Sequence, residues 1–231
     1  MNQTILMMNT PKSNTDFLIV ALDYDKKQDA LELVSRLENV NYYKVGMQLF
    51  YSAGFEIIED LKKLDKKVFL DLKINDIPNT ISKAVKSLSR LNVDLLTVFT
   101  SSDGVKAAAE AAQESAVKIL NVTVLTSQAK EPSGKNISDQ VLERAELTLK
   151  NGGHGIICSG AETSIVREKL GNDLIIVNPG IRPVGVDAGD QKRIVTPAEA
   201  KNSGASHIVV GRPITQAIDP VRSVSEILSS L

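Results

Sequence analysis

Apolar and polar positions along this chain follow two repeating patterns. Short continuous apolar runs predict strands covered on both faces, because half-exposed strands would carry polar residues at every second position. Between these runs, apolar side chains recur three and four residues apart, which predicts amphipathic helices. The pattern places eight strands, at residues 17–22, 42–45, 68–72, 94–99, 118–125, 155–158, 174–177 and 207–210.

A stretch with helical spacing follows each strand. These helices are predicted at residues 28–37, 49–64, 77–91, 104–113, 138–150, 162–170, 197–202 and 215–228. Asp76 is the predicted N-cap of the third helix, with Pro78 in its first turn, and Ser138 is the predicted N-cap of the fifth. Eight strand–helix units in 231 residues predict an α/β fold, a single-domain (β/α)8 TIM barrel over residues 17–231.

The alternative to a barrel is a doubly wound open sheet. We favour the barrel because no Gly-x-Gly-x-x-Gly turn follows the first strand. Residues 1–16 are polar apart from an apolar patch at 5–8, and we expect them to form a flexible tail. The patch is too short for the core of a signal sequence, and no run approaches the ~20 apolar residues of a membrane span. We therefore expect a cytoplasmic protein that does not bind membranes.

Composition excludes several kinds of function. A formal net charge of -1 argues against a nucleic-acid binder that works by neutralising phosphates. The single cysteine, Cys158, cannot form an internal disulfide, and its apolar neighbours predict a core position. The two histidines, His154 and His207, show no metal-binding spacing. The sequence therefore predicts no metal site.

The third predicted strand leads directly into three charged residues, Asp71, Lys73 and Asp76. Residues two apart on a strand share a face, so Asp71 and Lys73 are expected to point the same way. Burying a charge costs several kcal/mol unless it is paired. The stretch is therefore either a self-neutralised structural cluster or a reaction site.

In (β/α)8 barrels the chemistry occurs at the C-terminal ends of the strands. The polar residues predicted at those ends are Asp23, Lys44, Asp71, Lys73, Thr100, Thr126, Ser127, Ser159, Asn178 and Arg212. Charge recurs there on the first, second, third and eighth strands, which favours a reaction site over a structural cluster.

Two segments near the C-terminus could hold an anion. The long segment 179–193 follows the seventh strand and offers the donors Arg182, Gln191, Lys192 and Arg193. The second segment begins at Gly211 and Arg212, after the eighth strand, and the loops after strands seven and eight form the usual phosphate site of this fold. The alternative for Arg182 and Arg193 is that they are solvated loop charges.

Taken in order, these motifs resemble the orotidine 5'-phosphate decarboxylase family. The stretch 71–80 reads Asp-Leu-Lys-Ile-Asn-Asp-Ile-Pro-Asn-Thr, and the resemblance continues through residues 21–23, 44–46, 122–127, 179–182, 187–193 and 211–215. It implies decarboxylation of orotidine monophosphate to uridine monophosphate, the last step of de novo uridine monophosphate synthesis. It also implies a homodimer with shared active sites and no metal or cofactor.

The resemblance also assigns roles to residues. Lys73 would donate a proton, Asp71 would lie beside the substrate carboxylate, and Lys44 would complete a charged row with them. Asp76 and Thr80 would reach into the partner subunit's site. The remaining implied substrate contacts are Asp23 and Lys44 for the ribose, Thr126 and Ser127 for the pyrimidine, and Gln191, Gly211 and Arg212 for the phosphate, with Pro179 and Arg182 nearby. The chain departs from the family at Asn75 and Asn178, which are not expected to affect the charged set.

Two alternatives remain at this point. Related sugar-phosphate decarboxylases and synthases share Asp-x-Lys-x-x-Asp but use Mg²⁺, with a glutamate where this chain has Lys44. A cation at that position would repel a metal. The other alternative is a non-catalytic nucleotide-binding barrel, which would have no use for Lys73 between two carboxylates.

Overall fold

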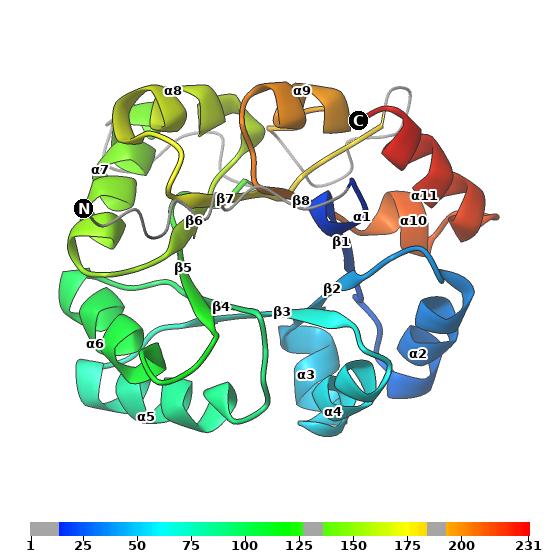
Figure 1. The fold of residues 1–231 in the computed structure, drawn as a ribbon, viewed down its shortest axis with the longest axis horizontal. Coiled ribbons are helices and arrows are strands. Elements are labelled where there is room, and N and C mark those ends of the chain that lie inside the picture. The colour runs from blue at the N-terminus through cyan, green and yellow to red at the C-terminus, as the bar shows by residue number, and fades with distance from the viewer. Residues whose placement is uncertain (1–13, 127–135, 184–192) are drawn as a thin grey trace, which may run out of the picture.

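Eight parallel strands form a closed barrel in the order of the chain, and β1 pairs with β8 to close it (Figure 1). The structure is a computed structural model and describes residues 14–126, 136–183 and 193–231. The predicted (β/α)8 barrel is confirmed, and the open-sheet alternative is wrong. The strands are β1 (Leu18–Ala21), β2 (Tyr42–Gly46), β3 (Lys67–Ile74), β4 (Leu95–Val98), β5 (Lys118–Val122), β6 (Gly155–Ile157), β7 (Ile175–Asn178) and β8 (His207–Val210).

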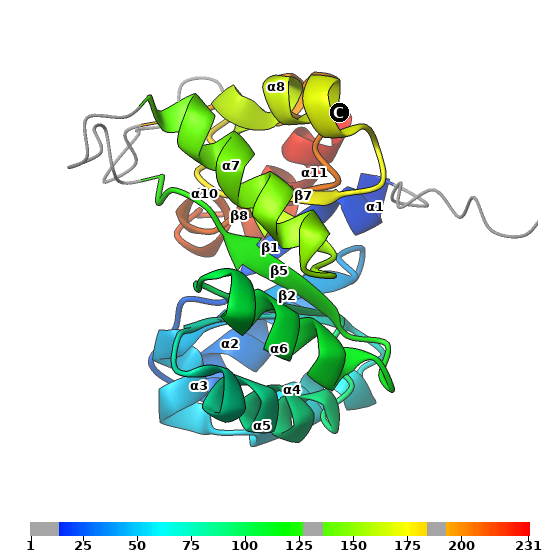
Figure 2. The same cartoon turned by 90° about the vertical axis from the view of Figure 1, so that its left-hand side faces the viewer.

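Apart from the short α1, which lies beside β1 and β8, the helices lie outside the strands around the barrel (Figure 1, Figure 2). They are α1 (Asn14–Phe17), α2 (Lys27–Arg36), α3 (Met47–Ala53), α4 (Glu56–Lys63), α5 (Pro78–Ser89), α6 (Ser102–Ala112), α7 (Ile137–Lys150), α8 (Gly160–Leu170), α9 (Pro197–Asn202), α10 (Arg212–Thr215) and α11 (Pro220–Ser229). Within the described ranges, no helix combines the length and apolar character needed to cross a membrane.

Two predicted helices differ from the observed ones in where they begin or break. The helix expected at 49–64 breaks at Gly54, whose φ of 65° is left-handed and ends α3. The helix expected at 215–228 begins later, as α11 at Pro220, because Asp219 caps it by accepting a hydrogen bond from the Arg222 amide. Residues Arg212–Thr215 form the separate short helix α10.

Both predicted N-caps are wrong by one or two residues. The N-cap of α5 is Ile77, and the Asp76 carboxylate accepts a hydrogen bond from the Ile77 amide at 2.7 Å. The N-cap of α7 is Asn136, whose side chain accepts from the Ser138 amide at 2.9 Å. An asparagine is as good a cap as a serine, and the sequence offers both within three residues.

Two separate apolar layers make up the core. The barrel interior is filled by Ile19, Ala21, Tyr42, Phe69, Leu95, Leu120, Val122, Ile157, Ile175, Val177 and Val209. The neighbouring strand residues face outward and pack under the helices, for example Val20, Tyr43 and Leu70. This alternation decides which residues at the strand ends can reach the barrel mouth.

The start of the described chain is attached to the barrel through His207. Residues 14–16 were expected to belong to a tail, and they lie in the short helix α1. The carbonyl of Asp16 accepts a hydrogen bond from His207 Nδ1 at 2.8 Å, and the imidazole packs edge-on against Tyr42 with ring centroids 5.4 Å apart. Burial lowers the pKa of His207 to about 4.

This buried imidazole predicts a pH-dependent stability. In the unfolded chain the histidine pKa is near its ordinary value of about 6.5, so between pH 6.5 and 4 the unfolded state binds more protons. The contribution of His207 is therefore present above pH 6.5 and is lost as the pH falls toward 4. We expect His207→Gln to reduce the stability difference between pH 7 and pH 5 by about 1 to 2 kcal/mol, measured by urea unfolding at both pH values. An unchanged difference would contradict this account.

Candidate active site

A row of four charged side chains with alternating sign lies at the C-terminal ends of the first three strands. Lys44 Nζ is 3.2 Å from Asp23 Oδ1 and 3.9 Å from Asp71 Oδ2. Asp71 Oδ2 is also 2.8 Å from Lys73 Nζ. The two acids and two bases neutralise one another, which is how the burial of Lys44 and Asp71 in the middle of the row is tolerated.

Strand register places these residues on the inner face of the barrel. Lys44 follows Tyr42 at the interval of two residues that returns to the same face, and Asp71 follows Phe69 in the same way. Tyr42 and Phe69 both belong to the barrel interior. Lys44 and Asp71 therefore lie at the mouth of the barrel, and each side chain is only 13% exposed.

Strand β3 departs from regular pairing at the reactive stretch. Leu70 pairs with Leu96 and Ile74 with Val98, so β3 advances four residues while β4 advances two. Within this bulge, Lys73 has a left-handed φ of 51°, which costs about 1 to 2 kcal/mol for a residue with a Cβ. The predicted meeting of Asp71 and Lys73 is confirmed, but regular strand alternation is not its cause.

Thr97, which is fully buried on β4, was not among the predicted site residues. Its hydroxyl lies 2.9 Å from the backbone nitrogen of Lys73 and 2.9 Å from Asp71 Oδ1. The signal in the sequence was a polar residue at an inward position of an otherwise apolar strand, two residues after Leu95.

A cavity of about 140 Å³ opens beside the charged row. Its charged lining residues are Lys44, Asp71 and Lys73. Thr126 and Pro179 also line the cavity. The other lining residues are apolar: Phe69, Val122, Val124, Leu125, Ile157 and Val209. A cavity with an apolar wall opposite a few convergent charged groups is typical of small-molecule sites.

The remaining predicted residues lie around this cavity or beyond it. Asp23 is half exposed and lies beside Gly211, where a Cβ would come within 3.5 Å of its carboxylate. Asp76 and Thr80 are both exposed, and within the described residues Asp76 makes no ion pair. Arg212 is exposed at the start of α10. Ser127 and Gln191 lie outside the described residues.

Of the two arginines in the segment after β7, Arg182 is buried and the Arg193 side chain is 12% exposed and paired, so the alternative that they are solvated loop charges is wrong. Arg182 is 7% exposed and donates to the Ile181 carbonyl at 2.9 Å. Arg193 donates to Glu162 at 2.7 Å and to the Leu125 carbonyl at 3.2 Å. Burial raises the pKa of Glu162, and the Arg193 charge opposes that rise. Arg193 is therefore a link between α8 and the end of β5.

Two polar residues at strand ends have structural roles. Asn178 accepts from the Thr163 hydroxyl at 3.0 Å and donates to the Cys158 carbonyl at 3.0 Å. Ser159 is the N-cap of α8 and accepts from the Ala161 amide at 3.3 Å. Cys158 is fully buried, as predicted, and burial raises the pKa of its thiol to about 12.

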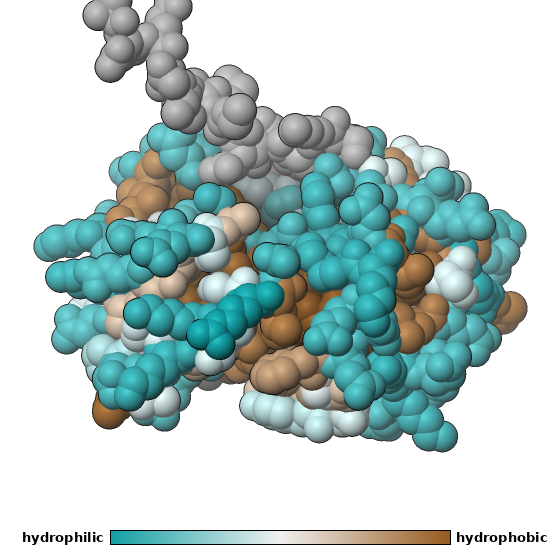
Figure 3. All heavy atoms as spheres, turned by 60° about the horizontal axis from the view of Figure 1, so that its bottom comes forward, coloured by the Kyte–Doolittle hydropathy of each residue, from teal (hydrophilic) through white to brown (hydrophobic). Residues whose placement is uncertain are grey.

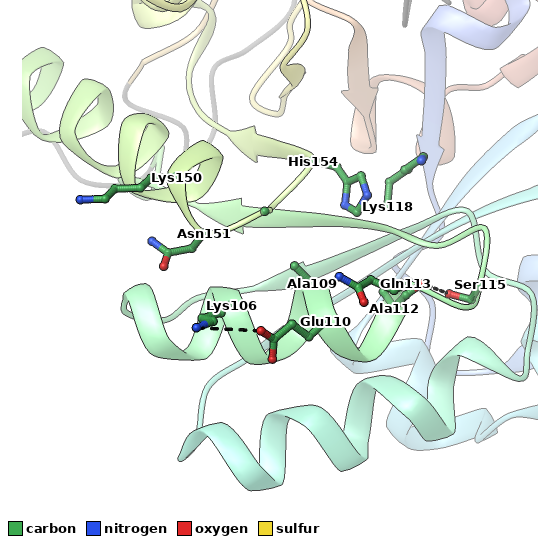
Figure 4. A pocket seen from close by; sticks show the side chains of 11 residues that line it. Lys106, Ala109, Glu110, Ala112, Gln113, Ser115, Lys118, Lys150, Asn151 and His154 are labelled. Carbon is green, nitrogen blue, oxygen red and sulfur yellow. Dashed lines mark hydrogen bonds and ion pairs between the residues drawn. The ribbon is translucent and has the colours of Figure 1, made fainter. Parts of the chain in front are cut away.

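A larger cavity, of about 610 Å³, lies between α6 and α7 at the opposite end of the barrel (Figure 4). Figure 4 shows Lys106 and Glu110 on α6 below Lys150 and Asn151 at the end of α7. Its inner part is lined by His154, whose Nδ1 accepts from the Ile119 amide at 3.1 Å. This cavity adjoins the N-terminal ends of β5 and β6, the face that serves stability in such barrels, so we place the chemistry in the smaller one.

Sequence comparison identifies close relatives. The sequence model described as Orotidine 5'-phosphate decarboxylase / HUMPS family matches residues 16–227. Two proteins named orotidine 5'-phosphate decarboxylase, from Rhodopseudomonas palustris (strain BisB5) and Methylobacterium sp. (strain 4-46), are each 42% identical to this chain. The alignments cover 97% of this chain, and 98% and 99% of the two relatives.

Solved structures agree with the sequence comparison. The crystal structure of orotidine 5'-phosphate decarboxylase from Lactobacillus acidophilus superposes with a TM-score of 0.80 at 37% identity, covering 92% of this chain and 97% of that one. The crystal structure of an uncharacterized conserved protein from Geobacillus kaustophilus gives a TM-score of 0.77 at 29% identity, covering 92% and 99%.

The buried pair of Arg193 and Glu162 generates a stability prediction. Arg193→Met leaves the Glu162 carboxylate buried without its partner, so we expect the free energy of unfolding to fall by about 3 kcal/mol. Adding Glu162→Gln removes the orphaned charge and should restore at least about 1 kcal/mol. Urea unfolding of the two variants measures both effects, and a double variant no more stable than Arg193→Met would contradict the pairing.

Proposed function

Because this chain belongs to the orotidine 5'-phosphate decarboxylase / HUMPS family, we propose that it converts orotidine 5'-monophosphate to uridine 5'-monophosphate with Lys73 as the proton donor. The enzyme class that follows from its named relatives is a carboxy-lyase. The observation that supports the residue roles is the contact of 2.8 Å between Lys73 and Asp71 at the barrel mouth. The reaction would serve pyrimidine synthesis in the cytoplasm.

The chemistry needs a cation at one carbon atom. The bond between C6 of the pyrimidine and the carboxyl carbon breaks, its electron pair stays on C6, and CO2 leaves. The Lys73 ammonium then gives a proton to C6, and the resulting amine regains a proton from water. A fixed positive charge aimed at the position where negative charge develops stabilises the transition state more than the ground state.

The carboxylates of Asp71 and Asp23 have different roles in this proposal. Asp71 lies against Lys73, and the ion pair of 2.8 Å holds the ammonium group in place. Its oxygen atoms would also face the substrate carboxylate, and the repulsion between them is relieved as CO2 departs. Lys44, between Asp71 and Asp23, holds the Asp71 carboxylate in place. Its ammonium would donate to ribose hydroxyl oxygens, and the Asp23 carboxylate would accept from the ribose hydroxyls.

Substrate groups remote from C6 supply the binding energy. Thr126 lines the cavity and, with Ser127, would meet the pyrimidine ring. The phosphate would lie near Gly211, Arg212 and Gln191, close to Asp23 and the ribose, with Pro179 and Arg182 behind them. Binding energy from the phosphate contacts can hold the substrate carboxylate against Asp71, because those contacts are unchanged when the bond to CO2 breaks.

We further propose that a second copy of this chain completes each site. Every residue from Asn75 to Thr80 is exposed, although this stretch belongs to the segment 71–80 that resembles the family. Large apolar side chains are exposed on the neighbouring elements, with Tyr51 74%, Phe55 53% and Ile77 65% exposed. Figure 3 shows apolar side chains gathered in the middle of the face formed by α3, α4 and α5. A partner on this face would cover them and receive Asp76 and Thr80.

The metal-dependent relatives are the nearest alternative within enzymes. Among residues 14–126, 136–183 and 193–231, no group of three or more His, Cys, Asp or Glu side chains is placed to hold a metal ion. Lys44 occupies the position at which a metal ligand would be needed, and it contacts both neighbouring acids. Assaying orotidine monophosphate turnover with and without EDTA separates the two, because a Mg²⁺-dependent enzyme would lose activity.

The role of Lys73 can be tested directly. We expect Lys73→Ala to lower kcat by at least about 10³-fold, because it removes both the proton donor and the cation at C6. The variant should still bind uridine monophosphate, measured by calorimetry. Lys150→Ala, at the exposed end of α7, is the matched control and should keep wild-type activity. Lys73→Ala activity close to the wild type would refute the assignment.

A shared site can be tested by mixing inactive variants. A dimer of one Asp71→Asn chain and one Asp76→Asn chain has one site with both changes and one site with neither. After random exchange, half of the dimers are mixed, so about a quarter of wild-type activity should return. Mixing Asp71→Asn with Lys73→Ala is the control, since every site then carries a defect. No recovery in the first mixture, with subunit exchange verified by mass labels, would count against a shared site.

A further inference from the structure

The Thr97 hydroxyl connects two parts of the reactive stretch that otherwise lack a common support. It accepts from the backbone N–H of Lys73 at 2.9 Å and donates to Asp71 Oδ1 at 2.9 Å. The direction of both bonds is fixed, because an amide N–H can only donate and an ionised carboxylate can only accept. A hydroxyl does both at once, and an apolar residue of the same shape does neither.

The Lys73 backbone has no regular strand partner for this N–H. Pairing between β3 and β4 stops after Leu70 and resumes at Ile74, whose carbonyl accepts from the Phe99 amide at 2.9 Å. Lys73 lies between these points with its left-handed φ of 51°. A strained backbone of this kind persists only where its surroundings hold it. Thr97 supplies the hydrogen bond that the strand ladder does not.

The Asp71 carboxylate is held from both sides. Oδ2 faces the ammonium groups of Lys73 and Lys44, at 2.8 and 3.9 Å. Oδ1 receives the hydroxyl of Thr97. With one oxygen bound to cations and the other to Thr97, the plane of the carboxylate is fixed. The orientation of Asp71 toward a ligand is therefore set by β4 as well as by the charged row.

We propose that Thr97 is a positioning residue that sets the orientation of both the Lys73 ammonium and the Asp71 carboxylate for reaction. The inference rests on the proposed decarboxylation and adds a group that acts through Lys73 and Asp71 without touching the reacting atoms. It follows that the hydroxyl matters for the chemical step and little for substrate binding, because ribose and phosphate contacts lie elsewhere.

Thr97→Val and Thr97→Ser separate the hydroxyl from the shape of the side chain. Valine keeps the shape without the hydroxyl, and we expect kcat to fall about 10- to 100-fold with KM changed by less than about twofold, since small misplacements of catalytic groups cost rates of this order. Serine keeps the hydroxyl and should restore kcat to within about threefold of the wild type. Thr148→Val, which removes a buried threonine hydroxyl on α7, is the control and should leave kcat unchanged.

A second measurement does not depend on the reaction. Hydrogen exchange of the Lys73 amide, followed by NMR in the ligand-free protein, should be faster in Thr97→Val than in the wild type and in Thr97→Ser. If the wild type does not decarboxylate orotidine monophosphate, the proposed function fails, and this exchange rate still tests the link between Thr97 and Lys73. Unchanged exchange in Thr97→Val, or wild-type kcat in that variant, would overturn the inference.

Discussion

The ion pair between Asp71 and Lys73 depends on an interruption of the pairing between β3 and β4. A regular strand would send the Lys73 N–H into the ladder, and here it bonds to the Thr97 hydroxyl instead. The bulge lets the Lys73 ammonium turn back onto the Asp71 carboxylate, 2.8 Å away. The barrel around the bulge holds a strained backbone that a short peptide could not maintain.

The rest of the barrel mouth follows from this arrangement. Charges of opposite sign extend outward from Asp71 through Lys44 to Asp23, so each ion is stabilised by a neighbour. Below them the barrel is closed by apolar side chains, which limits water near the pair and strengthens its electrostatic effect. Arg193 pairs with Glu162 and donates to the carbonyl of Leu125, which lines the same cavity.

Much of the fold could be predicted because it depends on local patterns. The strands were found from apolar runs, and their alternation with eight helical stretches identified a barrel. The break between α3 and α4 and the later start of α11 were missed, since the left-handed turn at Gly54 and the cap at Asp219 are single-residue events within continuous helical spacing. Lys44, Asp71 and Lys73 were predicted together because charge at several strand ends is unusual. The role of Arg193 was left open, because the sequence of a loop does not show whether its arginine will meet a buried acid in the folded protein.

The sequence by itself determined the order of strands and helices, the charged residues at the strand ends and the motifs that identify the family. Those features depend on residue type and on spacing along the chain, and both can be read directly from the sequence. Only the tertiary structure showed that Thr97 supports both Lys73 and Asp71, that β3 bulges there, and that Asn75 to Thr80 are exposed in one chain. These three findings depend on contacts between strands or on which surface stays exposed after folding. Neither the contacts nor the exposed surface can be derived from spacing along the chain.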